Sequence, residues 1–301
     1  MQAVVVHQAG GPEVLNLEEA ERPEPADGEV LIRVRAASVN PVDWKTRRSF
    51  EPGTLPAVLG RDVSGTVEAS RTEGFSEGDE VFGFAGSGGY AEFTASPAGS
   101  IAKKPVGIGD EQAAGIPVAG STAWGALFDV GGLQPGQTAL ITGAAGGVGH
   151  LAVQFAKHAG ARVIGTGSSR NRDFVLGLGA DEYIDYTRQD VAEVASDVDV
   201  ALDTVGAETT QSVVPTVREG GIAVTIASAP PQDTARQRGI RAELAYGRPS
   251  TQLLTQIAEL VASGDVRVEI AEALPLAEVR RAHELSESGH TRGKLILTIG
   301  K

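Results

Sequence analysis

The spacing of apolar residues follows two patterns along the chain, and the change comes near Ser121. In the first part, short apolar runs such as residues 4–6 and 30–35 are bounded by glycine, proline and aspartate. Proline and glycine also recur there at short intervals. Such runs are typical of strands that many tight turns connect. The first part is therefore predicted to form a compact, β-rich, barrel-like domain.

The second pattern alternates predicted strands with predicted helices. Residues 138–142 are apolar, as in a buried parallel strand, and apolar residues then recur at helical spacing from Gly147 to Gly160, which can end a helix. The alternation continues with strands predicted at 162–165, 183–186, 198–202 and 222–226, and with helices predicted from about Asn171 and over 251–263. This order predicts a doubly wound parallel sheet.

Two segments near the end of the chain differ from this alternation. Residues 228–239 are polar and contain Pro230 and Pro231, so we expect a loop there. Residues 293–299 are mostly apolar, and we expect them to form a strand that returns to the first domain. The sequence thus predicts one domain that is interrupted by another.

Composition narrows the classes of function. The 301 residues carry a formal net charge of −13, which argues against nucleic acid or a membrane surface as partner, because both require clustered lysine and arginine. The absence of cysteine excludes disulfides, thiolate nucleophiles and cysteine-ligated zinc. The N-terminal residues lack a secretory pattern, and no apolar run is long enough to span a membrane, so we expect a cytoplasmic protein.

A glycine-rich turn follows the predicted strand 138–142 and precedes a predicted helix. It reads Gly143-Ala144-Ala145-Gly146-Gly147-Val148-Gly149, and from Ala144 it fits the pattern A-x-G-x-x-G. Gly146 lets the backbone approach a pyrophosphate, and Gly149 lets the helix pack against the strand. The helix N-terminus adds N–H groups that bind phosphate oxygens. Since strand, turn, helix and second strand occur in the required order, this turn is predicted to bind a dinucleotide.

The residues after the second strand favour NADPH over NADH as that dinucleotide. NAD enzymes usually carry an acidic residue there, which binds the ribose 2′-hydroxyl. Here Ser168, Ser169, Arg170 and Arg172 precede the first acidic residue, Asp173. Two hydroxyls and two guanidinium groups suit a 2′-phosphate. The alternative is a solvated helix start that one of the serines caps, and both roles can hold together.

With these residues in view, the chain resembles the medium-chain dehydrogenase/reductase superfamily, and within it the zinc-free quinone oxidoreductase (zeta-crystallin-like) branch. Besides the glycine turn, the similarity lies in residues 37–43, 59–65, 78–83, 89–93, 119–124, 179–181, 203–206 and 293–294. It implies an α/β fold in which a GroES-like β-rich catalytic domain is interrupted by a Rossmann domain with a doubly wound parallel sheet. The implied boundaries are 1–120 and 262–301 for the GroES-like domain and 121–261 for the Rossmann NADP-binding domain.

The resemblance also argues against a metal. The positions that match the catalytic zinc ligands of related alcohol dehydrogenases hold Asn40, Arg61 and approximately Val118, and none of these is a zinc ligand of the expected kind. The cysteine-rich structural zinc segment is missing as well. No metal site is therefore expected, and zinc-dependent alcohol oxidation is the rival interpretation that metal analysis would decide.

Three residues are predicted catalytic residues. Asn40 resembles the residue that faces the nicotinamide and the substrate carbonyl, although it also suits a cap before Pro41. Asp43 would orient Asn40 or Lys45, and a purely structural role is the alternative. The N–H groups of Asn40, together with Lys45 or a ribose hydroxyl, would hydrogen-bond the developing oxyanion. The sequence identifies no proton donor.

Further residues are assigned to the cofactor by the same resemblance. Thr122 resembles a residue that contacts the nicotinamide amide. Tyr186 resembles an aromatic residue near the adenosine phosphate, with a plain strand-end tyrosine as the alternative. The loop 203–206 would border the nicotinamide ribose. The remaining members of the predicted cofactor site are Val205, Ala227 and Lys294.

Together these residues predict a zinc-independent, NADPH-dependent oxidoreductase that transfers hydride to a quinone or an α,β-unsaturated carbonyl. Such acceptors delocalise negative charge and need less help from a Lewis acid than an unactivated ketone does. The alternative is an NADPH-binding redox sensor or structural protein with little catalysis. We also expect a homodimer, formed through a strand at 239–245 that extends the sheet across subunits.

Overall fold

The computed structural model describes residues 1–51 and 53–300. By packing, the chain divides into two compact units. Unit 1 contains Met1–Val118, Pro249–Gly264 and the segment from Val268 onward, and unit 2 contains Ala119–Arg248 with Asp265–Arg267. The chain thus leaves unit 1, forms unit 2 and returns. The predicted domain boundaries, which place residues 249–261 with the Rossmann domain, stay a prediction.

Unit 1 is rich in strands, as its short apolar runs predict. A three-stranded sheet has the order β2-β1-β4, and a seven-stranded sheet has the order β15-β16-β3-β5-β6-β8, with β7 paired to β3. The strands are β1 (Gln2–Val6), β2 (Asn16–Glu19), β3 (Glu29–Val39), β4 (Ala57–Val58), β5 (Asp62–Ser70), β6 (Glu80–Phe84), β7 (Phe93–Pro97), β8 (Ile101–Lys103), β15 (Ile270–Pro275) and β16 (Lys294–Thr298).

The last strand returns to unit 1, as predicted. β16 runs antiparallel to β3, with Leu295 opposite Val39 and Thr298 opposite Ala36. This register brings Lys294, which precedes Leu295, to the end of β3. A core of buried aliphatic residues from both strands and their neighbours supports the sheet. The helices of unit 1 are α1 (Pro41–Arg48), α2 (Asp110–Ala114), α9 (Thr251–Ala262) and α10 (Val279–Glu287).

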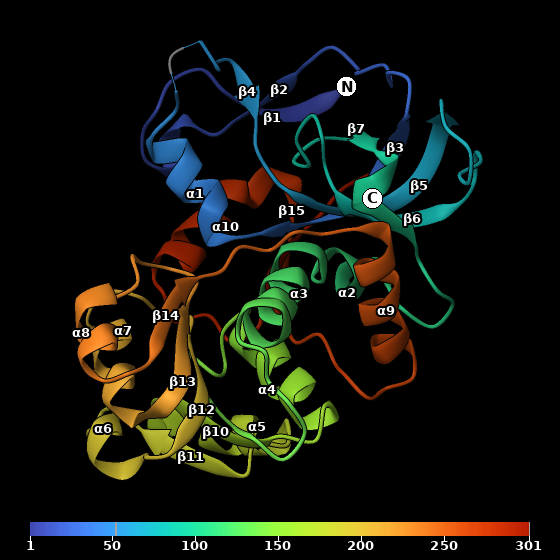
Figure 1. Ribbon diagram of the computed structural model, residues 1–301. Coiled ribbons are helices and arrows are strands. Elements are labelled where there is room, and N and C mark those ends of the chain that lie inside the picture. The colour runs from blue at the N-terminus through green and yellow to red at the C-terminus, as the bar shows by residue number, and fades with distance from the viewer. Residues whose placement is uncertain (52, 301) are drawn as a thin grey trace. The chain divides into compact units, whose positions relative to one another are not determined.

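Unit 2 contains a six-stranded sheet with the order β11-β10-β9-β12-β13-β14, in which all neighbours are parallel. Its strands are β9 (Thr138–Ile141), β10 (Arg162–Gly167), β11 (Glu182–Asp185), β12 (Val198–Asp203), β13 (Val217–Thr225) and β14 (Arg241–Leu244). In Figure 1 the sheet lies between α4 and α5 on one side and α6, α7 and α8 on the other. The predicted doubly wound parallel sheet is therefore confirmed.

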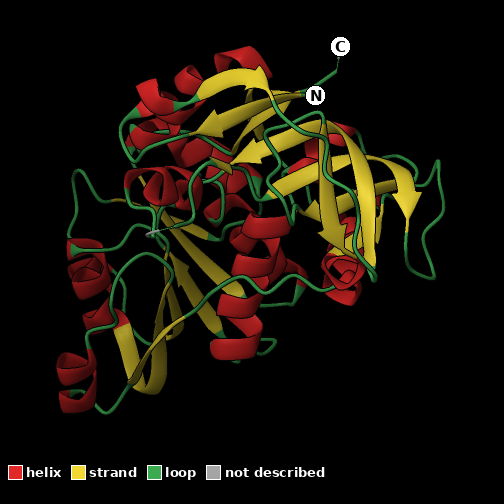
Figure 2. Ribbon diagram, turned by 90° about the horizontal axis from the view of Figure 1, so that it is seen from above, coloured by secondary structure: helices red, strands yellow, loops and turns green. Residues whose placement is uncertain are grey.

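The helices of unit 2 alternate with its strands along the chain, and Figure 2 draws the helices in red and the strands in yellow. They are α3 (Pro117–Trp124), α4 (Gly149–His158), α5 (Arg172–Gly177), α6 (Val191–Val194), α7 (Glu208–Val213) and α8 (Gln232–Gln237). A π-helical turn, Gly125–Val130, continues α3. In the described part of the chain, no helix is both long enough and apolar enough to cross a membrane.

Helix α8 corrects the prediction that residues 228–239 form a loop. Pro231 stands directly before the helix, where its missing N–H costs nothing, because the first N–H groups of a helix have no partner within it. Ala235 is 1% exposed and anchors the helix in the core of unit 2. Asp233 in the first turn forms an ion pair with Arg236. One buried side chain thus outweighs the polar composition of the segment.

Candidate active site

The glycine turn of unit 2 joins β9 to α4. Gly143 has a φ of +54°, a left-handed conformation that glycine adopts readily. A Cβ atom on Gly149 would lie 2.2 Å from the carbonyl oxygen of Gly143, so no side chain fits there. Gly143, rather than Ala144, therefore makes the tight turn, and α4 begins at Gly149, two residues later than predicted. This close approach lets α4 pack against β9, as in turns that bind a pyrophosphate at a helix N-terminus.

A second loop of unit 2 follows β12 and is ordered by one buried carboxylate. Asp203 Oδ1 accepts from the Thr142 hydroxyl at 2.7 Å and from the amide of Val205 at 3.1 Å. Asp203 Oδ2 accepts from the amide of Gly206 at 3.0 Å and from the Thr210 hydroxyl at 2.5 Å. The loop carries the predicted site residue Val205, which is 57% exposed. Asp203 itself was not predicted as a site residue.

A pocket of about 430 Å³ lies where β10 and β11 end. Ser169 and Arg172, both predicted to bind a 2′-phosphate, line it together with Arg188, which the sequence analysis missed. Tyr183, Asp185 and Gln189 complete the lining. Parallel pairing of β10 with β11 brings these segments together. The pocket thus combines the guanidinium groups of Arg172 and Arg188 and the Ser169 hydroxyl with one carboxylate, that of Asp185, and its two guanidinium groups suit a phosphate monoester.

Three further residues that were predicted to bind the cofactor, Ser168, Arg170 and Tyr186, do not line this pocket. The carbonyl oxygen of Ser168 accepts a 2.7 Å hydrogen bond from the Tyr183 hydroxyl. Arg170 belongs to the 3-10 helix Ser169–Asn171 and is not among the pocket residues. Tyr186 follows β11 with 56% of its surface exposed, outside the lining of the pocket.

Two predicted cofactor residues contact glycines of unit 2. Thr122 lies in α3 and is 8% exposed, and Gly247 approaches so closely that a Cβ there would lie 2.5 Å from Thr122 Oγ1. Ala227 faces Gly206, where a Cβ would lie 3.0 Å from that of Ala227. Both contacts are packing contacts, so the assignment of Thr122 and Ala227 to the cofactor stays a prediction.

Unit 1 contains a buried polar cluster at the end of β3, made of Asn40, Asp43, Asp62, Tyr90 and Lys294. Lys294 Nζ donates to Asn40 Oδ1 at 2.5 Å, and Asn40 Nδ2 donates to Asp62 Oδ2 at 2.9 Å. Asp43 Oδ2 accepts from the Asn40 amide at 2.8 Å and from the Tyr90 hydroxyl at 3.0 Å. None of the five residues is more than 3% exposed. We call this set the buried cluster.

Burial shifts the ionisation of the whole buried cluster. It raises the pKa of Asp43 to about 7, although hydrogen bonds from Asn40 and Tyr90 oppose the shift. It raises the pKa of Asp62 as well, and there the charge of Lys294 opposes it. It lowers the pKa of Lys294, against the attraction of both carboxylates. Burial and the Asp43 carboxylate together hold the pKa of Tyr90 well above its usual value.

The contacts of Asn40 change the role that its sequence position suggests. Its side-chain N–H groups donate to Asp62 and, at 3.3 Å, to Ser38, so they are already used inside the protein. Asn40 also directly precedes α1, and Asp43 accepts its amide as the third residue of that helix, so the predicted cap is present. The prediction that Asn40 donates to an oxyanion therefore finds no support in its hydrogen bonds.

Lys45 does not join the buried cluster. Its side chain is exposed, and its ammonium lies 5.7 Å from the centre of the Trp44 ring. Asp43 therefore orients the backbone at Asn40 and not Lys45. Further along α1, the buried side chain of Arg47 contacts His283 Nδ1 at 2.9 Å and forms an ion pair with Glu287. Burial, and then the charge of Arg47, lower the pKa of His283 to about 3, so this histidine is neutral.

Asp62 is the residue of this cluster that the sequence analysis missed. It accepts hydrogen bonds from the Ser38 hydroxyl at 2.8 Å and from the Val118 amide at 3.0 Å, besides that from Asn40. The segment 59–65, which contains Asp62, was named only as part of the family resemblance. The partners could not be identified, because they lie far away in the sequence.

These residues do not fit a zinc ion. Asn40 Oδ1 already accepts from an ammonium group, and a divalent cation beside Asn40 would be repelled by Lys294. Arg61 is exposed, and Val118 contributes only its backbone amide. Among residues 1–51 and 53–300, no group of three His, Asp or Glu side chains is placed to hold a metal. The residues around Asn40 therefore disagree with a metal site.

Comparisons with known proteins identify the family. Two family models match, the alcohol dehydrogenase GroES-like domain over residues 26–106 and the zinc-binding dehydrogenase over residues 178–297. The chloroplast envelope quinone oxidoreductase homolog of Arabidopsis thaliana is 34% identical and covers 91% of this chain and 91% of its own. The NADPH-dependent alkenal/one oxidoreductase of the same plant is also 34% identical, over 99% of this chain and 79% of its own.

A solved structure agrees with these relatives. Escherichia coli quinone oxidoreductase complexed with NADPH superposes with a TM-score of 0.90 at 29% identity, over 99% of this chain and 100% of that chain. The chain belongs to the medium-chain dehydrogenase/reductase superfamily. Within it, the chain groups with the quinone oxidoreductases. The predicted family, the GroES-like and Rossmann fold and the prediction of an enzyme are thereby confirmed, and the chain is an oxidoreductase.

Proposed function

We propose that this oxidoreductase works without zinc and transfers hydride from NADPH to a quinone or an α,β-unsaturated carbonyl. The observation that carries the proposal is the buried cluster. Where related alcohol dehydrogenases hold a metal, this chain holds an amide fixed between an ammonium and a carboxylate. Without a Lewis acid, acceptors that delocalise their own negative charge are the favoured substrates.

NADPH fits the residues of unit 2. The glycine turn carries no side chain at Gly143, Gly146 and Gly149 that would keep a pyrophosphate away, and the amides at the start of α4 suit its charge. Ser169, Arg172 and Arg188 offer a hydroxyl and two guanidinium groups to the 2′-phosphate. When bound, NADPH supplies the hydride, while the protein contributes binding, orientation and exclusion of water. The E. coli relative solved with NADPH supports this choice of cofactor.

The class of acceptor rests on the relatives as well as on chemistry. The names of the two plant proteins point to quinones and to alkenals or alkenones. In both kinds of acceptor a carbonyl group is conjugated with a carbon–carbon double bond. We propose this shared chemistry as the substrate class.

Steady-state kinetics with NADPH, 1,4-benzoquinone and a panel of enones test the proposal, together with metal analysis of the purified protein. We expect NADPH oxidation with at least one acceptor and no stoichiometric zinc. Stoichiometric zinc would refute zinc independence and support alcohol oxidation. Tight NADPH binding without oxidation by any acceptor would refute the reductase and favour the redox sensor.

The 2′-phosphate pocket yields a sharper test of cofactor choice. We expect Arg172→Ala and Arg188→Ala each to raise the KM for NADPH about tenfold and to leave the KM for NADH almost unchanged, because each removes a charge-assisted hydrogen bond to the phosphate. Arg162→Ala is the matched control, since Arg162 pairs with Glu182 and does not line the pocket. Equal changes of both KM values in the pocket variants would contradict the assignment.

We also propose a cytoplasmic homodimer that pairs through β14. This strand ends the order of the sheet in unit 2, so one of its edges is available for pairing with a second copy. Light scattering coupled to size-exclusion chromatography measures the mass in solution, and a monomer would refute the dimer. Limited proteolysis tests the proposed domain boundaries at residues 120 and 262, and cell fractionation tests the compartment.

A further inference from the structure

The carboxamide of Asn40 is held in one orientation. An ammonium only donates hydrogen bonds and a carboxylate only accepts them, so the oxygen of Asn40 must face Lys294 and its nitrogen must face Asp62. A rotation of the amide by half a turn would place two donors against each other and two acceptors against each other. Lys294 and Asp62 thus form a clamp on Asn40 from opposite sides.

Lys294 is also the ammonium that balances the charge of this region. The other ionisable groups nearby are Asp43 on α1, Asp62 on β5 and the Tyr90 phenol, with the Arg47 and His283 pair beyond Tyr90. Arg47 is already engaged by Glu287. An isolated buried carboxylate is costly, so a compensating cation is needed beside Asp43 and Asp62. Within the described chain, the ammonium of Lys294 donates one hydrogen bond, to Asn40 Oδ1.

The partners of Lys294 are decided by the sheet. β16 pairs with β3 so that Lys294 arrives beside Asn40, although 254 positions separate the two residues in the sequence. Lys294 is 3% exposed, and its side chain packs near Gly115 at the end of α2. The ammonium is therefore held inside unit 1, beside Asn40.

We propose that Lys294 is a positioning residue of the reaction, which fixes the carboxamide of Asn40 and supplies the positive charge that compensates Asp62 and Asp43. This inference rests on the proposed function, because Asn40 is assigned to the nicotinamide side of the site by resemblance. Lys294 acts through Asn40 and Asp62, without contact to the substrate. Its loss leaves Asn40 Oδ1 without its donor and favours protonation of Asp62.

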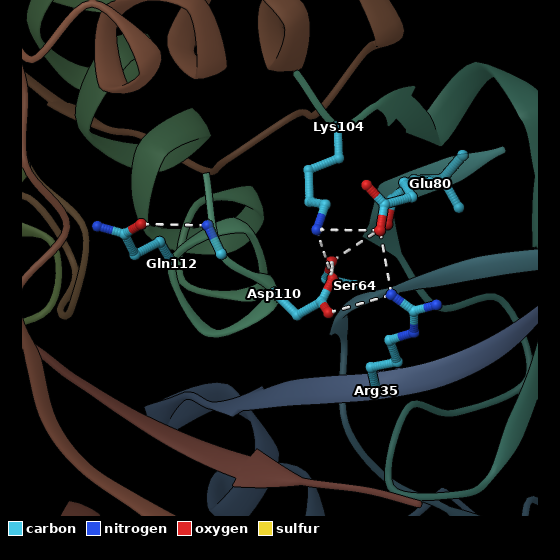
Figure 3. Close-up of polar contacts among 8 residues, drawn as sticks. Arg35, Ser64, Glu80, Lys104, Asp110 and Gln112 are labelled. Carbon is cyan, nitrogen blue, oxygen red and sulfur yellow. Dashed lines mark hydrogen bonds and ion pairs between the residues drawn. The ribbon is translucent and has the colours of Figure 1, made fainter. Parts of the chain in front are cut away.

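The experiment compares Lys294→Gln and Lys294→Arg with a matched control, Lys104→Gln. Lys104 is a second lysine of unit 1 with a side chain only 7% exposed, and it pairs with Asp110 in a separate cluster (Figure 3). We expect Lys294→Gln to lower kcat about 10- to 100-fold, with little change in the KM for NADPH, because Asn40 is displaced. Lys294→Arg keeps the charge and should restore part of this loss, and Lys104→Gln should leave kcat unchanged.

Two readouts separate positioning from a purely structural role. In Lys294→Gln the acidic limb of the pH profile of kcat should move to higher pH, because loss of the opposite charge of Lys294 raises the pKa of Asp62 further. Lys294→Arg and Lys104→Gln should keep the wild-type limb. Carbon-13 NMR titration of the aspartate carboxyls follows the pKa of Asp62 directly, with Asp62→Asn to assign the resonance.

The outcomes are distinct. An unchanged pH profile and an unchanged Asp62 titration in Lys294→Gln would overturn the inference. Equal losses of kcat in Lys294→Gln and Lys104→Gln would also overturn it. If Lys294→Gln does not fold, the Lys294→Arg variant decides. Arginine keeps the positive charge, so a shift of the acidic limb of the pH profile and of the Asp62 titration in this variant would contradict the proposal. If no acceptor is turned over by the wild type, the proposed function fails, and the NMR titration still tests the clamp.

Discussion

Two clusters of charged residues in unit 1 use similar side chains to opposite effect. The buried cluster holds the carboxylates Asp43 and Asp62 with one ammonium, that of Lys294. The second cluster, which we call the surface cluster, consists of Arg35, Glu80, Lys104 and Asp110, with two carboxylates and two cations (Figure 3).

The carboxylates respond differently in the two clusters. In the buried cluster, burial raises the pKa of Asp43 to about 7. In the surface cluster, burial also acts on Asp110, but hydrogen bonds from Lys104 and Ser64 and the charge of Arg35 outweigh it and hold the pKa of Asp110 below its usual value. Balance between charges and access to water therefore decide whether an aspartate stays ionised.

The largest difference is expected when one carboxylate is removed from each cluster. Asp62→Ala leaves the donors of Ser38, Asn40 and Val118 and the charge of Lys294 without their partner, so we expect a loss of about 3–5 kcal/mol in the free energy of unfolding. Asp110→Ala should cost less, because Lys104 keeps a second carboxylate, Glu80, at 3.6 Å and the Asp110 side chain is 23% exposed. Urea unfolding measures both values, and equal losses would remove the distinction between the clusters.

The second prediction concerns the pH dependence of stability. The pKa of Asp43 is about 7 in the folded protein, whereas the ordinary value for an aspartate, which applies in the unfolded chain, is 3.8. Between these two pH values Asp43 therefore carries a proton in the folded state but not in the unfolded state. The free energy of unfolding therefore falls as pH rises from about 4 to about 7 and is level above. Asp43→Asn keeps an oxygen for Asn40 and Tyr90 and removes the ionisation.

We expect the free energy of unfolding of Asp43→Asn to stay level between pH 4 and pH 7, whereas that of the wild type falls by about 2–4 kcal/mol over the same range. Urea unfolding across this range measures it. Asp110→Asn is the control, because a lowered pKa has the opposite sign and its stability contribution is lost as pH decreases. If the free energy of unfolding falls as much in Asp43→Asn as in the wild type, Asp43 is not the group that takes up the proton.

The smallest effect is expected at the exposed side of the surface cluster. Arg35→Gln removes contacts to Glu80 at 3.0 Å and Asp110 at 3.6 Å, and roughly half of the Arg35 and Glu80 side chains is exposed. We expect a loss of about 0–1 kcal/mol, which disappears in high salt, because water and ions screen exposed pairs. Thermal unfolding with and without salt measures it, and a loss independent of salt would mean that the cluster behaves as a buried one.

Residues close together in the sequence were predicted well. The glycine turn between β9 and α4 and the parallel strands of unit 2 follow from apolar spacing and from turn residues, which are local properties. Local composition was misleading at α8, because the burial of Ala235 depends on the core of unit 2. Gly143 was found to make the turn that the pattern assigned to Ala144, since backbone dihedrals decide that role.

The sites that combine distant segments were only partly predicted. Asn40, Asp43 and Lys294 were named, but the sequence left open whether Asp43 orients Asn40 or Lys45; Asp43 accepts the amide of Asn40, and Lys45 is exposed. Asp62 and Arg188 were missed. In each case the missing partner lies on another strand or loop, and its position depends on which strands pair and in which register.

By itself, the sequence determined the alternating strands and helices of the parallel sheet, the dinucleotide turn and the family, because hydrophobic spacing, glycine positions and motifs are read within short windows of the chain. Only the tertiary structure decided which groups bind the side-chain carboxamide of Asn40. That depends on Lys294, 254 positions away, and on Asp62, 22 positions away. Burial of these charges together, which shifts their pKa values, exists only after β3, β5 and β16 have paired.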